Sequence, residues 1–304
     1  MASHSPQLHS STDLTTASES AASKSVSTPA KPLSTTLLSP TAKCALLTPS
    51  QHHYAHVLSC MAKHQLKAPV LGVAWDGNGE GQNSMLWGGE FLQPTQNDTL
   101  YSFERVARFL PYYLPSEDNC FLEPRHSALG LLYGCYGAAA FEMTDLAPLQ
   151  FFTTSQLDVL RKTLTQKINV SATSSVGRIF DGVASLLNLH HYVGFEGQAA
   201  LTLEFAATQS STRNTYPFTV TDTQPSLVDW REILQAIVED CRNAVLTHII
   251  AAKFLNTLVE IVVEIAHRTN NSQIVLAGSC FQNRILIERA IRRLSAEGFT
   301  PYWT

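Results

Sequence analysis

Apolar residues in the first third of the chain fall into two short runs, separated by a polar, glycine-rich segment. Val70–Trp75 reads VLGVAW and Met85–Leu92 reads MLWGGEFL, and both runs have the length and composition of strands. The segment between them, Asp76–Gly81, reads DGNGEG. We therefore predict a β-hairpin with a glycine-rich turn and an acidic residue at the end of its first strand.

Further along the chain, the pattern predicts helices and another strand. An amphipathic helix is expected over Val176–Leu187, after the capping residues Thr173–Ser175. Ile274–Ala277 has the character of a buried strand, and a glycine turn connects it to a helix over Arg284–Ala296. Together these elements predict an α/β fold.

The first 43 residues differ from the rest of the chain. Residues 1–42 contain eleven Ser and seven Thr but four charged residues and no aromatic one. Such a segment buries too little apolar area to offset the entropy of ordering it. We predict a disordered Ser/Thr-rich leader over 1–43 and a folded domain over 44–304.

Composition and charge exclude several classes of function. The apolar fraction is 44%, the charged fraction is 15% and the formal net charge is −4. No strongly basic surface is therefore expected for nucleic acid or anionic lipid. No apolar run reaches membrane-spanning length, the N-terminus lacks the features of a secretory signal, and no pair among the six cysteines has CxxC spacing. We expect a cytoplasmic protein.

Three histidines lie within five positions in the stretch QHHYAH. The preceding letters TPSQ, at 48–51, form a helix start, with a Thr cap, Pro at the first position and Gln to complete a capping box. The helix is expected to run to about Lys63. His52 and His56 are four residues apart, so their imidazoles share one face and suit a divalent cation such as zinc or iron. The alternative is a polar first turn with solvated histidines.

The predicted hairpin has the composition of a phosphate-binding element. Gly77 and Gly79 allow backbone N–H groups to approach a phosphate closely, and the Asp76 carboxylate suits a metal or a substrate hydroxyl. Asn78 lies between the glycines and belongs to the same candidate site. A strand, Asp-Gly turn and strand in this order is typical of actin-like and sugar-kinase-like ATPases, although many ordinary hairpins carry Asp-Gly turns.

Three polar residues in the later elements are candidates for nucleotide or substrate binding. Arg178 and Asp181 are nearly one turn apart on the predicted 176–187 helix, and the alternative for them is a surface ion pair. Asn283 lies where a glycine turn meets a helix N-terminus, which favours anions or nucleotides. The alternative for Asn283 is a simple helix cap.

Six motifs together resemble the C-terminal domain of HypF, the carbamoyltransferase family of [NiFe]-hydrogenase maturation. In order they are QHHYAH, LGVAWDGNGEGQNSMLWGGEF, EPRHSAL, TSSVGRIFDGVASLL, FEGQAALTLE and AGSCFQNRILIERAIRRL. The resemblance covers residues 48–304. It implies a two-lobed fold of the actin-like and sugar-kinase-like ATPase (ASKHA) type, with the first lobe incomplete.

The resemblance implies a reaction and a set of site residues. HypF-type proteins form carbamoyl adenylate from carbamoyl phosphate and ATP, and transfer the carbamoyl group to the C-terminal cysteine of HypE for cyanide synthesis. By analogy, His52 and His56 would bind a divalent metal, zinc or iron. Asp76–Gly79 would hold the adenylate phosphate, Asp181 the ribose hydroxyls and Asn283 the nucleotide.

The sequence also departs from the family pattern. Leu255 stands where a histidine is usual, and Ser279 replaces one glycine of a Gly-Gly turn. The family's preceding domains are absent, and so is the Asp-Gly-Gly motif, with the third metal ligand, that follows the position of Thr304. These departures predict a truncated copy that binds metal weakly and does not transfer carbamoyl on its own.

Two other functions stay open at this point. One is a non-catalytic remnant that binds metal, nucleotide or a protein partner, which the missing ends and Leu255 favour. The other is a tRNA threonylcarbamoyl transferase, against which the negative net charge and the HypF-like FQNR and GRIFD motifs argue.

Overall fold

The computed structural model describes residues 51–303 except 82–84, 98–99 and 116–120. The leader predicted over 1–43 lies outside the described residues, and so do positions 48–50 of the predicted helix start.

The strands of the described residues form one mixed sheet in the order β6-β7-β3-β2-β1-β8-β9, with β4 and β5 joined beside β2. β1 is central: it pairs antiparallel with β2 and parallel with β8, which in turn pairs parallel with β9. The strands are β1 Leu71–Glu80, β2 Leu86–Asn97, β3 Leu100–Phe109, β4 Tyr112–Pro115, β5 Val170–Thr173, β6 Thr219–Val220, β7 Ser226–Asp229, β8 Gln273–Ala277 and β9 Thr300–Trp303.

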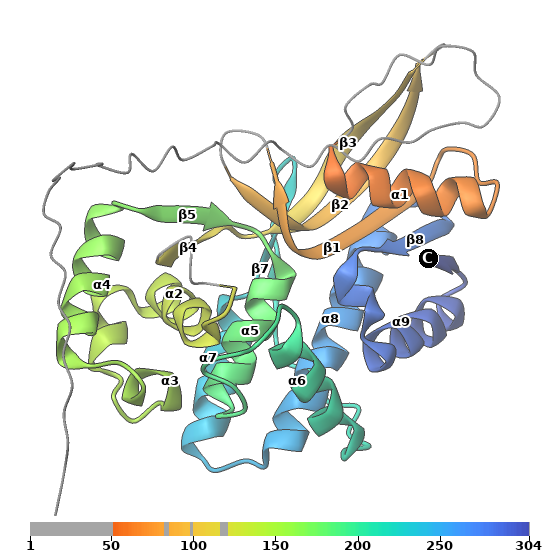
Figure 1. The fold of residues 1–304 in the computed structure, drawn as a ribbon. Helices are drawn as coiled ribbons and strands as arrows, with labels where there is room; N and C mark the ends of the chain where they lie inside the picture. Colours follow the sequence, from red (N-terminus) through yellow and green to blue (C-terminus); the bar gives the residue numbers. More distant parts are fainter. Residues whose placement is uncertain (1–50, 82–84, 98–99, 116–120, 304) are drawn as a thin grey trace, which may run out of the picture. The chain divides into compact units, whose positions relative to one another are not determined.

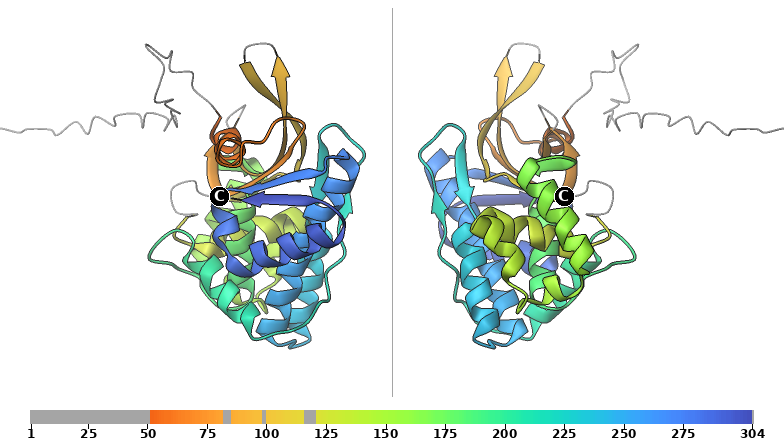
Figure 2. Two further views of the ribbon diagram at one scale, coloured as in Figure 1. Left: turned by 90° about the vertical axis from the view of Figure 1, so that its right-hand side faces the viewer. Right: turned by 90° about the vertical axis from the view of Figure 1, so that its left-hand side faces the viewer.

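Helices cover both faces of this sheet (Figures 1 and 2). Helix α1 packs on one face, against β1 and β8, while α5, α8 and α9 belong to the large apolar cluster on the other. The helices are α1 His52–Lys63, α2 Pro124–Tyr136, α3 Ala147–Gln150, α4 Thr154–Gln166, α5 Val176–Leu186, α6 Gln198–Thr208, α7 Arg231–Arg242, α8 Thr247–Thr269 and α9 Arg284–Ala296, with the 3₁₀ helices η2 Gly137–Glu142 and η3 Ser279–Gln282.

Alternation along β1 explains this arrangement. Leu71, Val73 and Trp75 face the large helical layer, whereas Ala74 faces α1, and Gly72 lets Val57 of α1 approach the strand. A strand that is apolar on both sides must be covered on both sides. The expected α/β class is thus confirmed, with one sheet in the described residues.

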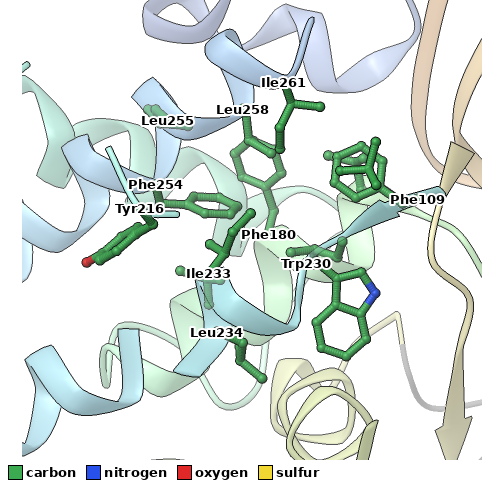
Figure 3. Packing of buried hydrophobic residues seen from close by; sticks show 14 of the residues in the cluster. Phe109, Phe180, Tyr216, Trp230, Ile233, Leu234, Phe254, Leu255, Leu258 and Ile261 are labelled. Atoms are coloured by element: carbon green, nitrogen blue, oxygen red, sulfur yellow. The ribbon is translucent and has the colours of Figure 1, made fainter. Parts of the chain in front are cut away.

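The large helical layer has an aromatic centre (Figure 3). The rings of Phe180 in α5 and Phe254 in α8 meet edge to face, 5.2 Å between centroids, and both are buried. Leu255, which stands where the family pattern has a histidine, is also fully buried in this cluster. Its side chain therefore serves packing.

The predicted hairpin differs from the structure at its turn. β1 does not end at Trp75 but continues to Glu80, and the connection lies farther on, where the Gly81 amide donates to the Met85 carbonyl at 2.9 Å. The register shifts between Trp75 and Gly79, so residues 76–78 form a bulge in the strand. The segment DGNG is a bulge and not the turn itself.

The start of α1 also differs from the prediction. The helix begins at His52, and Gln51 is its N-cap, with a side chain that accepts from the Tyr54 amide at 3.0 Å. Gln51 has an extended backbone, so it caps the helix instead of continuing an earlier turn. The predicted end at Lys63 is confirmed.

The remaining predicted elements are close to those observed. The 176–187 helix is α5, the 274–277 strand is β8 and the 284–296 helix is α9. Among the described helices, none combines the length and apolar composition that a membrane crossing requires.

Candidate functional site

Five separate parts of the chain line one cavity of about 750 Å³. They are the first turn of α1, the bulge of β1, the stretch from α5 into α6, the turn from β8 into α9, and Trp303 at the end of β9. The predicted site residues in its lining are His52, His56, Asp76, Gly77, Asn78, Arg178, Asp181 and Asn283. Gly79 is not in the lining, since it lies against the ring of His53.

The two histidines and Asp76 converge at one point of this cavity. The Nε2 atoms of His52 and His56 are 3.1 Å apart, and Asp76 Oδ2 lies 3.7 Å from the first and 3.4 Å from the second. Burial lowers the pKa of His56, although Asp76 opposes this shift, so its imidazole is held neutral. Two neutral imidazoles and a carboxylate are a donor set for a divalent transition metal.

Asp76 is fixed by a residue more than 200 positions away in the sequence. Its Oδ1 accepts a hydrogen bond of 2.6 Å from the Ser279 amide, whereas its buried Oδ2 has no hydrogen-bond partner. An unpaired buried carboxylate oxygen is costly unless a cation faces it. Gly278, with φ +96°, brings the chain to this point, where a Cβ would lie 2.3 Å from the Trp75 carbonyl oxygen. Ser279 contributes its backbone N–H, which any residue but proline supplies.

The bulge of β1 is held by the start of α5. Ser175 Oγ lies 2.8 Å from the Asp76 carbonyl oxygen and 2.7 Å from that of Gly77, and it also accepts from the Arg178 amide at 3.1 Å. Gly177 is required here, since a Cβ on it would lie 2.5 Å from the Gly77 Cα. The N-cap residue of α5 thus holds the β1 bulge that carries Asp76 against the start of this helix.

Arg178 and Asp181 form a buried ion pair. Their atoms Nη1 and Oδ2 are 3.0 Å apart and both side chains are almost fully buried, so the alternative of a surface pair is wrong. The other side of the guanidinium contacts Glu196, where Nη2 and Oε1 are also 3.0 Å apart. Arg178 is therefore balanced by two carboxylates inside the cavity.

Asn283 serves as a helix cap and still has a free donor. Its Oδ1 accepts from the Leu286 amide at 2.9 Å, while its buried Nδ2 has no hydrogen-bond partner. The cap alternative is confirmed, but an unpaired Nδ2 in the cavity lining leaves a donor for a ligand.

Two acidic residues of the site escaped the sequence analysis. Glu196 contacts Arg178 and lies over Gly77, and Glu204 Oε1 accepts from the Arg284 amide at 2.9 Å. Both belong to the motif FEGQAALTLE, from which we predicted no individual site residue. The two carboxylates on either side of its apolar stretch, which forms α6, would have been the pattern that identifies them.

The charged side chains that line the cavity are mostly negative, which disfavours an anionic ligand unless a cation binds with it. Arg178 is the one Lys or Arg among the described residues that line the cavity, against Asp76, Asp181, Glu196 and Glu204. A phosphate-bearing ligand would meet excess negative charge in a partly enclosed space. A cation at His52, His56 and Asp76 would offset it.

Asp181 gives a pH-dependent prediction. Burial raises its pKa from the usual 3.8 to about 6, partly opposed by Arg178. The folded state then holds this proton more tightly than the unfolded chain, so its contribution to stability is present below pH 3.8 and is lost as pH rises through about 6. Relative to Asp181→Asn, the wild type should lose roughly 3 kcal/mol across that range. Urea unfolding of both proteins between pH 3.5 and about 7 measures this. Parallel stability curves would contradict the raised pKa.

Comparison with known proteins matches the arrangement. A family model described as carbamoyltransferase, Kae1-like domain, second subdomain, matches residues 72–304. The chain is 37% identical over 267 residues to the carbamoyltransferase HypF of Synechocystis sp., covering 83% of this chain and 34% of that protein. It is 28% identical over 257 residues to HypF of Rhizobium leguminosarum, covering 84% and 32%. The chain spans about a third of the length of these two relatives.

Solved structures agree with this family. A full-length HypF in its phosphate- and nucleotide-bound form superposes with a TM-score of 0.76 at 34% identity, over 84% of this chain and 39% of that one. The HypF of T. kodakarensis gives a TM-score of 0.69 at 27% identity, over 83% and 33%.

Proposed function

Because the chain belongs to the HypF carbamoyltransferase family, through the second Kae1-like subdomain, we propose that its cavity transfers a carbamoyl group from carbamoyl adenylate. Carbamoyl adenylate is formed from carbamoyl phosphate and ATP. The acceptor is the C-terminal cysteine of a HypE-like protein rather than a nucleic acid, and the product supplies the cyanide ligand in [NiFe]-hydrogenase maturation. The chain covers about a third of its relatives' length, and we propose that the formation of carbamoyl adenylate belongs to the parts of those relatives that it does not match.

One observation carries the proposal. The unpartnered Asp76 Oδ2 faces two histidines in the same cavity that holds the Arg178–Asp181 pair and the free Nδ2 of Asn283. A nucleotide-linked acyl donor needs a metal-binding position, a carboxylate that accepts from hydroxyl groups, and an amide donor, and the cavity offers all three.

The residues fit a divalent metal. His52, His56 and Asp76 would hold it, zinc or iron, and the bound ion would polarise a carbonyl or phosphoryl oxygen. The Asp76 carboxylate stays oriented through the Ser279 amide, which leaves its other oxygen free for the ion.

The other cavity residues would orient the adenylate. Asp181, held by Arg178, accepts hydrogen bonds from ribose hydroxyls, and Asn283 Nδ2 donates to the nucleotide. Gly77 and Asn78 in the β1 bulge lie along the phosphate.

In the transfer, the acceptor thiolate attacks the carbamoyl carbon. A carbon–sulfur bond forms, the bond from that carbon to the adenylate oxygen breaks, AMP leaves with the bonding electron pair, and the thiol proton passes to solvent. The acceptor must therefore reach the cavity with a cysteine at a flexible end.

Calorimetric titration of AMP into metal-loaded protein tests the binding half of the proposal. Asp181→Asn should weaken AMP binding about 10- to 100-fold, because a hydrogen bond to a charged group is worth about 1.5–3 kcal/mol. The matched control is Asp158→Asn, at an exposed position of α4, which should bind as the wild type does. Absence of AMP binding by the wild type would refute the proposal.

The transfer half needs a HypE-like partner. Labelled carbamoyl adenylate is supplied to the chain with that partner, and label on the partner's cysteine is measured. The proposal predicts label on that cysteine when the remaining HypF domains are also supplied. AMP binding without labelling, even when the remaining HypF domains are added, would favour the non-catalytic alternative.

A further inference from the structure

The motif EPRHSAL is not used by the proposed chemistry, yet it holds a deeply buried arginine. Glu123 is the N-cap of α2, and Arg125, in the first turn, is 3% exposed. Arg125 does not line the cavity. A buried guanidinium needs several partners to offset its desolvation.

Arg125 joins three separate segments through those partners. Its Nε donates to Glu123 Oε2 at 2.8 Å, and its Nη1 donates to the carbonyl oxygen of Phe151. The guanidinium carbon lies over two rings, 4.2 Å from the centroid of Phe152 and 4.4 Å from that of Tyr192. The residues before α2, the end of α3 and the α5–α6 connection therefore meet at one side chain.

The α5–α6 connection leads from this point directly into the cavity. The Val193 amide donates to the Leu122 carbonyl oxygen at 2.9 Å, which binds the connection to the segment before α2. Phe195 and Glu196, three and four residues after Tyr192, line the cavity. This connection has no helix or strand over residues 188–197, so its position depends on such contacts.

The segment before α2 also contacts a residue of the cavity lining. The ring of Phe121 lies 4.9 Å from the guanidinium carbon of Arg178, on which both Asp181 and Glu196 converge. Two of the three segments that Arg125 joins therefore also contact Arg178.

We propose that Arg125 is a positioning residue for the nucleotide side of the cavity. It holds the segment before α2 and the α5–α6 connection together, so that Glu196 and Phe121 meet Arg178. The role rests on the proposed function, because the ligand is taken to be an adenylate. It requires arginine, since a lysine ammonium has neither the fork that joins Glu123 to Phe151 nor the planar cation that contacts two rings.

The test compares Arg125→Lys with the wild type by two binding measurements on the whole chain. AMP affinity in the presence of Co²⁺ should fall at least about tenfold, as expected when a binding wall loses its position. The Co²⁺ absorption spectrum and affinity should stay unchanged, because His52, His56 and Asp76 lie on other elements. Chymotrypsin should also cut more quickly within residues 188–197, which contain Tyr192 and Phe195, because Arg125 no longer holds the backbone there.

The matched control is Arg161→Lys. Arg161 also lies over a ring, 4.8 Å from the centroid of Phe141, and pairs with Glu142 at 2.7 Å, but its side chain is 41% exposed and it does not line the cavity. It should leave AMP binding unchanged. If Arg125→Lys does not fold, Tyr192→Leu removes one of the two rings that contact Arg125, at a side chain that is 51% exposed, and should also weaken AMP binding.

The outcomes separate the two proposals. A wild type that binds Co²⁺ but not AMP refutes the proposed function and this inference with it. A wild type that binds AMP, with Arg125→Lys and Tyr192→Leu binding it equally well, overturns the positioning role alone. Equal loss of Co²⁺ and AMP binding would show a general structural role and would also overturn it.

Discussion

Replacement of Asp76 by alanine should lower the affinity for Co²⁺ by more than about 100-fold, since even residues behind metal ligands cost 10–100-fold. Asp76 Oδ2 lies 3.4 Å from His56 Nε2, and no other carboxylate among the described residues shares this cluster. The variant would leave two imidazoles, half of a tetrahedral shell. Titration of Co²⁺, followed by its visible absorption, measures the loss.

The control for this experiment is Glu80→Gln. Glu80 is an exposed carboxylate on the same strand. Its replacement removes one negative charge, as Asp76→Ala does, but leaves His52, His56 and Asp76 unchanged. Asp76→Asn keeps an oxygen acceptor for the Ser279 amide, and it should also lose most of the affinity because the charge is gone. Retention of tight Co²⁺ binding by both Asp76 variants would exclude this carboxylate as a ligand.

Phe254→Ala should destabilise the fold by about 3–5 kcal/mol, the usual cost of truncating a buried aromatic ring. Phe254 is fully buried, and its ring meets that of Phe180 edge to face between α8 and α5 (Figure 3). The cavity left behind is enclosed by helices that also pack on the sheet, so it cannot collapse easily. Urea unfolding at neutral pH measures the difference.

Phe205→Ala is the matched control for Phe254→Ala. Phe205 is 66% exposed on α6, and its truncation should change the unfolding free energy by no more than about 0.5 kcal/mol. Equal effects at the two positions would mean that the aromatic centre is not the main source of stability in this layer.

Local patterns predicted much of the fold and the pairs within single helices. His52 and His56 converge because a helix places every fourth residue on one face, and α9 begins where Asn283 caps it. Strand β8 was evident from its apolar run. These features depend on neighbours in the sequence, and the sequence contains them in full.

Features that depend on distant contacts could not be predicted in this way. The bulge at Asp76 exists because Ser175 contacts two of its carbonyl oxygens, and Ser175 is 99 positions away. The burial of Arg178 and Asp181 depends on Glu196 and Phe121, which no spacing rule connects to α5. Motif resemblance placed the site residues in one cavity, but it gave neither their partners nor the role of Arg125.

The parallel pairing of β1 with β8 has a consequence for the growing polypeptide. His52 and His56 can approach each other as soon as α1 forms, but Asp76 is oriented by the amide of Ser279, which is synthesised more than 200 residues later. During synthesis the chain offers a metal only the two histidines of α1, a weak and exchangeable pair. A tightly held ion therefore marks a chain in which β8 has already joined the sheet.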